Sequence, residues 1–168
     1  MQLKKTIALF LCLLLCMQVL TGSVFATDPN IKTISGDGVK VTFDMSNGTL
    51  TLYRLDGEQA HQMSNASTMG YPIVNGQNVQ DFTGFTCAVV QNAEGHLGVG
   101  DQMIITSTSP STGLVRSYLI ETSDTVAGAL YTETSYRATT VAVTPTWFVD
   151  SSFELSDHTN IIWSYNGG

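Results

Sequence analysis

Apolar and polar side chains alternate with a period of two residues along most of this chain, which is the pattern of β-strands that bury one face. Val39, Val41 and Phe43, for example, alternate with Lys40 and Thr42. No segment shows the 3.6-residue apolar period of an amphipathic helix. The alternation predicts about nine strands, and 59–69 is interpreted as a loop or a short irregular strand. The predicted strands are 39–45, 49–53, 71–74, 84–91, 102–108, 114–122, 127–134, 137–149 and 160–165.

The clearest local signal is Asn47-Gly48, which stands between two alternating runs. Both central residues of a type I′ turn need positive φ, and Asn-Gly is the dipeptide that adopts it most readily. A two-residue turn at this point predicts Met45 opposite Leu50 and Phe43 opposite Leu52. These four apolar side chains would then share one face, so the turn and the alternation predict the same hairpin.

Strands joined by tight turns, with no helix between them, predict an all-β fold with antiparallel pairing. A β-sandwich of about nine strands is the expected architecture, and an open barrel is the alternative. A turn is expected at 92–96, between the strands that end at 91 and begin at 102.

The N-terminus differs from the rest of the chain. Lys4 and Lys5 precede an almost unbroken apolar run, and Val24 and Ala26 occupy the small-residue positions of a cleavage site. This is the pattern of a Sec signal peptide, so we expect residues 1–26 to be removed and residues 27–168 to form one domain. An uncleaved membrane anchor is the alternative, but the run is shorter than the about 20 residues of a transmembrane helix. The expected product is secreted, to the exterior or the surface of a bacterial cell, and is not attached to a membrane after cleavage.

Cleavage also changes the charge and the cysteine content. It removes two of the seven Lys and Arg residues and none of the 14 Asp and Glu residues, which leaves a formal charge of −9. Such a domain repels phosphate backbones, so nucleic acid is not an expected partner. Cys12 and Cys16 leave with the signal peptide, so no internal disulfide is expected. Cys87 remains and shares the parity of Phe85 and Val89, which predicts a small buried side chain.

Signatures of catalysis are not found. His61, His96 and His158 lack the spacing of zinc ligands, so we predict no metal and no cofactor. The glycines at 95, 98 and 100 are not followed by the Lys-Ser/Thr of a phosphate-binding loop, and they predict a tight turn or a bulge. Carboxylates at 37, 44, 56, 58, 150, 154 and 157 form local groups, as glycosidase chemistry requires, but all stand at predicted turns or strand ends. No catalytic residue is therefore assigned.

Aromatic side chains gather in the C-terminal third of the chain. If they are exposed, Trp147, Trp163 and Tyr165 can stack on sugar rings or cover an interface with another domain, so they are our candidate site residues. The alternative, which the energetics of aromatic burial favour, is that they belong to the core.

A series of segments resembles a known family. It comprises 86–90, a strand-turn-strand at 95–106 around Leu97-Gly98-Val99-Gly100, a strand that ends at Glu121-Thr122, and 138–145, which ends at Pro145. With the opening hairpin at 38–49, this order resembles the N-terminal β-sandwich of α-galactosidase-like (melibiase-type) glycoside hydrolases. The resemblance covers 34–168 and implies a supersandwich-like antiparallel fold.

In that family the catalytic aspartates lie on a (β/α)8 barrel that follows the sandwich, and this sequence has no positions that match them. The resemblance therefore implies a non-catalytic accessory module of a longer secreted hydrolase. Its partners would be the barrel and a galactoside-type carbohydrate, with 163–168 approaching the barrel and Trp147 and Trp163 as contacts. Two alternatives remain: a free-standing carbohydrate-binding module, and an immunoglobulin-like surface or adhesion module with its aromatics buried.

Overall fold

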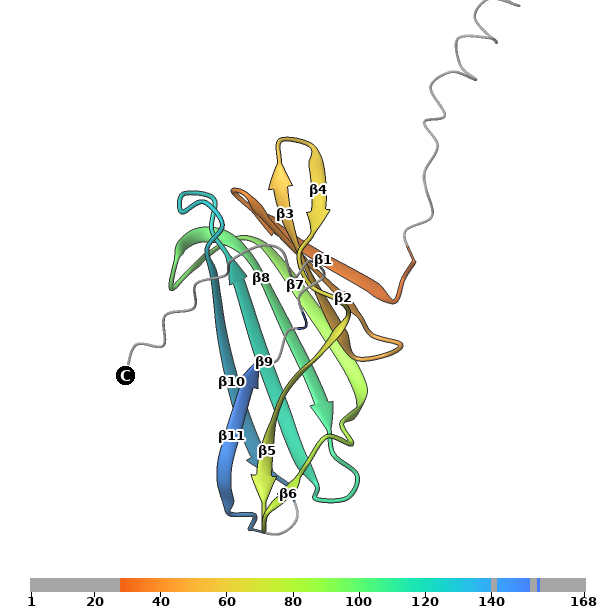
Figure 1. Cartoon of the computed structure of the whole chain (residues 1–168). Helices are drawn as coiled ribbons and strands as arrows, with labels where there is room; N and C mark the ends of the chain where they lie inside the picture. Colours follow the sequence, from red (N-terminus) through yellow and green to blue (C-terminus); the bar gives the residue numbers. More distant parts are fainter. Residues whose placement is uncertain (1–27, 140–141, 152–153, 155–168) are drawn as a thin grey trace, which may run out of the picture.

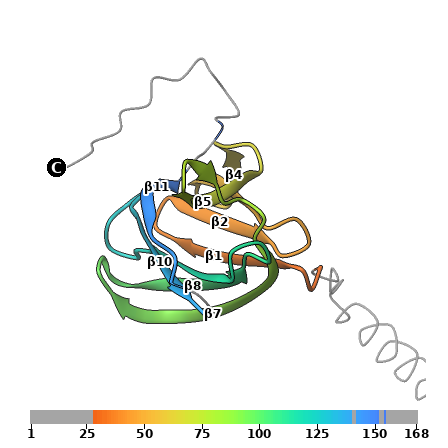
Figure 2. The ribbon, with the colours of Figure 1, turned by 90° about the horizontal axis from the view of Figure 1, so that it is seen from below.

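The chain folds into two antiparallel β-sheets that pack face to face. The structure is a computed structural model, and it describes residues 28–139, 142–151 and 154. Within these residues there are eleven strands and no helix, so none that could cross a membrane. Figure 2 shows the layer that contains β1 (Ile31–Gly36) and β2 (Val39–Asp44) above the layer that contains β7 (Thr83–Gly95) and β8 (Gly98–Thr108). The predicted all-β sandwich is confirmed.

The first sheet has the order β1-β2-β3-β5-β11, with β4 paired to β3 and β6 paired to β5. The second sheet has the order β10-β9-β8-β7, a simple meander whose long strands dominate Figure 1. The remaining bounds are β3 (Thr49–Asp56), β4 (Gln59–Gln62), β5 (Ser67–Val74), β6 (Gln77–Asn78), β9 (Leu114–Thr122), β10 (Leu130–Ala138) and β11 (Pro145–Ser151).

The core lies between the two sheets and is built from alternate residues of each. In β2 and in most of β9, buried positions alternate with partly exposed ones, as the period-two pattern predicts. Each fully buried apolar side chain contributes about 1.5–3 kcal/mol to stability. The buried cluster consists of Ile34, Val41, Phe43, Leu50, Met69, Met103, Ile105, Tyr118 and Ile120.

The first hairpin forms where it was predicted but in another register. Phe43 pairs with Leu50, so the loop has four residues, 45–48, and not two. The Asp44 carboxylate holds this loop: Oδ1 accepts the Ser46 N–H at 2.8 Å and Oδ2 accepts the Asn47 side-chain amide at 2.7 Å. Gly48 is the only residue of this loop with a positive φ, of 67°. A type I′ turn needs a positive φ at both central residues, so this loop is not of that type. Because the register differs by two residues, the same side chains still face the core.

Other boundaries differ from those predicted. β1, β4 and β6 were not among the nine predicted strands. β10 continues to Ala138, across the break expected between the strands at 127–134 and 137–149, and β11 begins only at Pro145. The turn expected at 92–96 lies at His96-Leu97, because Asn92, with a φ of 52°, forms a bulge within β7 and the strand continues to Gly95. The strand predicted at 160–165 lies outside the described residues.

One end of the sandwich is closed by three connections that approach each other at glycines. A Cβ atom at Gly36 would overlap the Ser123 backbone, and one at Gly100 would overlap the Thr122 carbonyl oxygen. Thr122 Oγ1 donates to Ser35 O at 3.0 Å, and Ser123 Oγ donates to Leu97 O at 2.9 Å. Backbones from β1, β8 and the segment after β9 therefore pack without intervening side chains, which only glycine allows.

Candidate functional site

The one predicted site residue whose side chain the structure describes is Trp147, and its side chain faces solvent. It lies on β11, which among the described strands pairs with β5 alone at the end of the first sheet, and it is 70% exposed. The neighbouring Phe148 points the other way and stacks on Tyr136 at 5.5 Å between ring centroids. The core interpretation is therefore wrong for Trp147, because only alternate residues of an edge strand reach the interior. Trp163 and Tyr165 lie outside the described residues.

An apolar hollow of about 500 Å³ lies beside Phe148, between β10 and β11. We call this surface, together with Trp147, the β10–β11 seam. Phe148 is 49% exposed, so two large aromatic side chains on consecutive positions of β11 meet solvent. The residues that line the hollow are Leu114, Thr134, Tyr136, Ala138, Val143, Pro145 and Phe148.

The histidines do not form a metal centre within the described part of the chain. His61 is exposed on β4, in the hairpin that extends beyond the body of the sandwich (Figure 1). His96 lies in the β7–β8 turn, and His158 lies outside the described residues. No group of three or more His, Cys, Asp or Glu side chains that could hold a metal occurs among the residues described.

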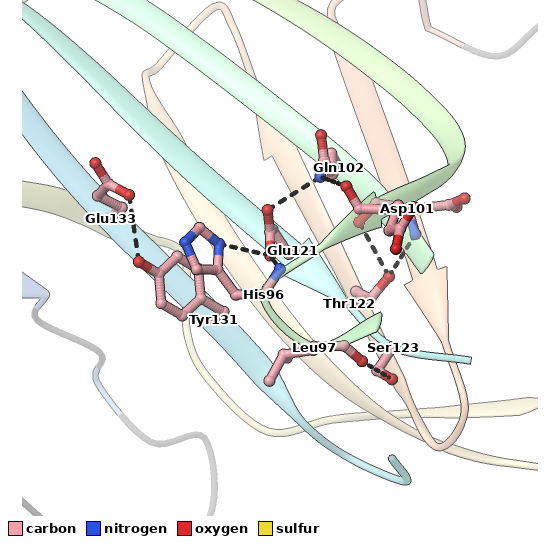
Figure 3. A network of polar contacts seen from close by, with 10 residues as sticks. His96, Leu97, Asp101, Gln102, Glu121, Thr122, Ser123, Tyr131 and Glu133 are labelled. Atoms are coloured by element: carbon pink, nitrogen blue, oxygen red, sulfur yellow. Dashed lines mark hydrogen bonds and ion pairs between the residues drawn. The ribbon is translucent and has the colours of Figure 1, made fainter. Parts of the chain in front are cut away.

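A buried carboxylate, Glu121, organises the turn that carries His96 (Figure 3). Its side chain is 3% exposed. Oε2 accepts the His96 backbone N–H at 2.8 Å and lies 3.2 Å from His96 Nδ1, while Oε1 accepts from Gln102 Nε2 at 3.0 Å. The imidazole stacks on Tyr131 with 4.0 Å between ring centroids, and the Tyr131 hydroxyl donates to Glu133.

This network fixes the ring of His96. A carboxylate only accepts hydrogen bonds, so Nδ1 carries the proton and Nε2 is the acceptor of the neutral ring. A buried carboxylate that orients an exposed imidazole also occurs in general bases. Here, however, Glu121 also binds the turn backbone and Gln102 of the same hairpin, so the arrangement accounts for the shape of the β7–β8 turn. Glu121 was not among the predicted site residues, because its outward parity in the strand at 114–122 predicts an exposed side chain.

Cys87 packs against the core but is only half-buried. Burial raises the pKa of its thiol to about 11, and the nearby charge of Lys32 opposes this shift only in part. A thiol with this pKa is protonated at neutral pH and is a poor nucleophile. The predicted packing role is therefore supported.

Arg116 is the functional candidate that the sequence analysis missed. It lies at a core position of β9, is 4% exposed, and lines a cavity of about 180 Å³. Nη1 donates to Gly70 O at 2.7 Å, Nε donates to Ser107 Oγ at 3.3 Å, and the guanidinium lies 4.2 Å above the Phe82 ring. The signal was visible in the sequence, because a charged residue interrupts the buried parity of the strand at 114–122.

No protein-family model matches the chain. It is 45% identical, over 177 aligned positions, to a protein of Flavonifractor plautii named A type blood alpha-D-galactosamine galactosaminidase. The alignment includes 98% of this chain but spans only 16% of the relative's length. A galactosaminidase is a glycoside hydrolase, the broad class that the sequence resemblance implied. Nearly the whole chain is thus similar to one segment of a much longer glycoside hydrolase.

Proposed function

We propose that this chain is a non-catalytic, N-terminal accessory β-sandwich of a secreted, α-galactosidase-like glycoside hydrolase. The observation that carries the proposal is its similarity, over 98% of its length, to only 16% of a galactosaminidase. A domain that forms a small part of a hydrolase is expected to support the catalytic part. By the relative's name, the substrate of the parent enzyme is an α-linked galactosamine or a closely related galactoside.

The described carboxylates are consistent with a supporting role. Glycosidases need two carboxyl groups about 5–10 Å apart that flank the bond to be cleaved. Asp44 instead binds its own turn, and backbone hydrogen bonding from Ser46 lowers its pKa. Glu121 is occupied by the β7–β8 turn. We expect the catalytic aspartates on a (β/α)8 barrel that follows the sandwich, as the resemblance implies.

The β10–β11 seam is the surface that we propose for contact with this barrel or with its carbohydrate substrate. Large exposed aromatic side chains are uncommon on an isolated surface and are enriched at interfaces. Phe148 provides such a side chain beside the apolar hollow, and Trp147 provides one on the opposite face of β11.

Export through the signal peptide is part of the proposal. Expression of the full chain in a bacterium with a Sec pathway should release a protein that begins at Thr27. N-terminal sequencing of the exported product measures this directly. A product that retains Met1 and stays in the membrane fraction would instead support the anchor alternative.

The accessory role is tested by exchange and deletion in the Flavonifractor plautii enzyme. Deletion of the matching segment should lower turnover of an aryl α-galactosaminide, and replacement of that segment by residues 27–168 of this chain should restore it. In this chimaera, Trp147→Ala should lower turnover, while Val126→Ala, at a residue that is 50% exposed in the loop between β9 and β10, should not. Full activity of the deletion variant would refute the accessory role.

The full chain alone should not hydrolyse aryl α-galactosides or α-galactosaminides. Turnover that a single Asp or Glu substitution abolishes would contradict the non-catalytic assignment. The exposure of Trp147 also favours a second candidate, a free-standing carbohydrate-binding module. That candidate predicts glycan affinity by calorimetry, lost in Trp147→Ala, together with no effect of the exchange. An immunoglobulin-like adhesion module was expected to bury its aromatics, which Trp147 does not.

A further inference from the structure

The guanidinium of Arg116 lies between the two sheets without a carboxylate partner in the described part of the chain. The only ion pair found among those residues is His96–Glu121. Arg116 has five N–H donors, and its contacts to described residues are made from Nε and Nη1. Both acceptors are neutral, so among the described residues the charge is compensated only by dipoles and by the face of the Phe82 ring.

A buried cation of this kind is costly to keep. Removing a charge from water costs several kcal/mol unless an opposite charge and good hydrogen bonds offset it. Burial accordingly lowers the pKa of Arg116, although the nearby Tyr136 and Tyr118 oppose the shift. An apolar residue of similar volume would fill the same position in β9 at a lower cost. An anion bound to the guanidinium would offset this cost.

The cavity beside Arg116 has the walls of a small-molecule site. Its apolar side is formed by Met69, Phe82 and Phe85, and exposed Thr68 and Gln80 lie toward solvent. Such sites combine aromatic walls with a few convergent polar groups. At about 180 Å³ the cavity is smaller than the about 300–1,000 Å³ of sites for drug-sized ligands, so it suits one ring with its substituents. The full lining is Asn47, Gly48, Thr68, Met69, Tyr71, Gln80, Phe82, Phe85 and Arg116.

We propose that this cavity binds a carboxylate-bearing monosaccharide, a uronic acid, with the carboxylate on the Arg116 guanidinium. The planar fork of arginine binds a carboxylate with two parallel hydrogen bonds. Thr68, Gln80 and Asn47 offer hydroxyl and amide groups to the sugar hydroxyls, and the aromatic wall faces the apolar face of the ring. The site does not depend on the chain being part of a hydrolase, since free uronate is sufficient to test it.

The test is a calorimetric titration of the full chain with D-galacturonate and, as the matched neutral ligand, D-galactose. The two sugars differ at one carbon, so their difference in affinity reports the carboxylate. Galacturonate should bind at least tenfold more tightly, and the difference should shrink as salt rises. Equal affinity for the two sugars, or no saturable heat with galacturonate, would overturn the proposal.

Variants locate the binding. Arg116→Met keeps the aliphatic stem without the charge, and it should lose at least tenfold in galacturonate affinity while the thermal midpoint stays close to that of the wild type. If Arg116→Met unfolds, Thr68→Phe still tests the site, because it fills the cavity from an exposed strand position. Thr68→Phe should abolish binding, and the matched control Thr132→Phe, at an exposed position of β10 outside the cavity, should not. Unchanged affinity in Thr68→Phe would place the ligand elsewhere.

A carboxylate of the chain itself is the competing source. The side chains of Asp150 and Asp157 are not among those described, so each is replaced by Asn. Unchanged galacturonate affinity in both variants supports an external ligand. A tenfold gain in affinity in either variant would show that the chain's own carboxylate occupies Arg116, and would overturn the proposal.

Discussion

Replacing Glu121 by Ala should cost about 3 kcal/mol of unfolding free energy. Glu121 accepts hydrogen bonds from the His96 backbone, the His96 ring and Gln102, and it is 3% exposed. Hydrogen bonds to a charged group contribute about 1.5–3 kcal/mol each, but two effects reduce the sum. The turn donors lie close enough to the surface to regain water, and the variant no longer has to desolvate a carboxylate. For a domain of this size, about 3 kcal/mol lowers the melting temperature by roughly 10 °C.

Two graded variants separate the hydrogen bonds from the packing. Glu121→Gln keeps the volume of the side chain and one acceptor oxygen. Its N–H₂ group, however, faces donors of His96 or Gln102 and cannot accept from them, so the variant should lose about 1–2 kcal/mol of unfolding free energy. His96→Ala removes the ring contact and the Tyr131 stack but keeps the backbone hydrogen bond, at about 1 kcal/mol.

Urea denaturation followed by circular dichroism gives all three values, with Glu133→Gln on the neighbouring strand as the control. Glu133 makes one exposed contact, to the Tyr131 hydroxyl at 3.2 Å, and its loss should change stability by less than about 0.5 kcal/mol. The reasoning fails if Glu121→Ala stays within about 0.5 kcal/mol of the wild type, or if Glu133→Gln costs as much.

Three further predictions concern other parts of the fold. The Cys87 thiol, with a pKa of about 11, should react with a disulfide reagent at pH 8 on the order of 10–100 times more slowly than in the unfolded chain, and equal rates would show an open site. Its raised pKa stabilises the fold below pH 9, an advantage that is lost as pH rises toward 11. Asp81 accepts from Ser109 Oγ at 2.6 Å and from the Ser111 N–H at 3.0 Å; its slight burial raises its pKa, but these hydrogen bonds outweigh that effect and leave the pKa below 3.8. The stability it adds above pH 3.8 should disappear as pH falls below that value, and Asp81→Asn, followed by acid denaturation, should lack this component; an identical acid profile would contradict the assignment. Gly100→Ala should cost on the order of 3 kcal/mol or abolish folding, because the new Cβ meets the Thr122 carbonyl oxygen, whereas Gly57→Ala, with φ +61° and open space, should cost about 1 kcal/mol. Thermal melts compare these two glycine variants, and similar values would show that Gly100 is not sterically constrained.

The first hairpin shows how far local pattern predicts structure. Alternation placed Phe43 and Leu50 on one buried face, because strand periodicity depends only on neighbouring residues. The prediction of a two-residue loop was wrong, because the Asp44 side chain caps a loop of four residues. An Asp or Asn side chain that bonds the backbone two residues on is a known turn former, so the signal was present in the sequence.

Trp147 and Arg116 show where local pattern is insufficient. Both lie on strands that alternation predicted at least in part, but whether a given face is covered depends on which strand ends the sheet. Among the strands that the structure describes, β11 pairs with β5 alone, and Trp147 is exposed. β9 lies inside its sheet under the opposite layer, so Arg116 is buried. Sheet order brings together residues far apart in the chain, and no period in the sequence encodes it.

By itself, then, the sequence determined the strand class, the alternating core and the resemblance to a glycoside-hydrolase sandwich, because period-two burial and turn residues are local properties. Only the tertiary structure decided the pairing order, the exposure of Trp147, the burial of Glu121 under the β7–β8 turn and the cavity at Arg116. Each of these depends on a contact between segments separated by tens of residues, such as Arg116 with Gly70 or His96 with Glu121. Neither sheet is stable without the other. Such contacts therefore form only when the two sheets bury their apolar faces against each other.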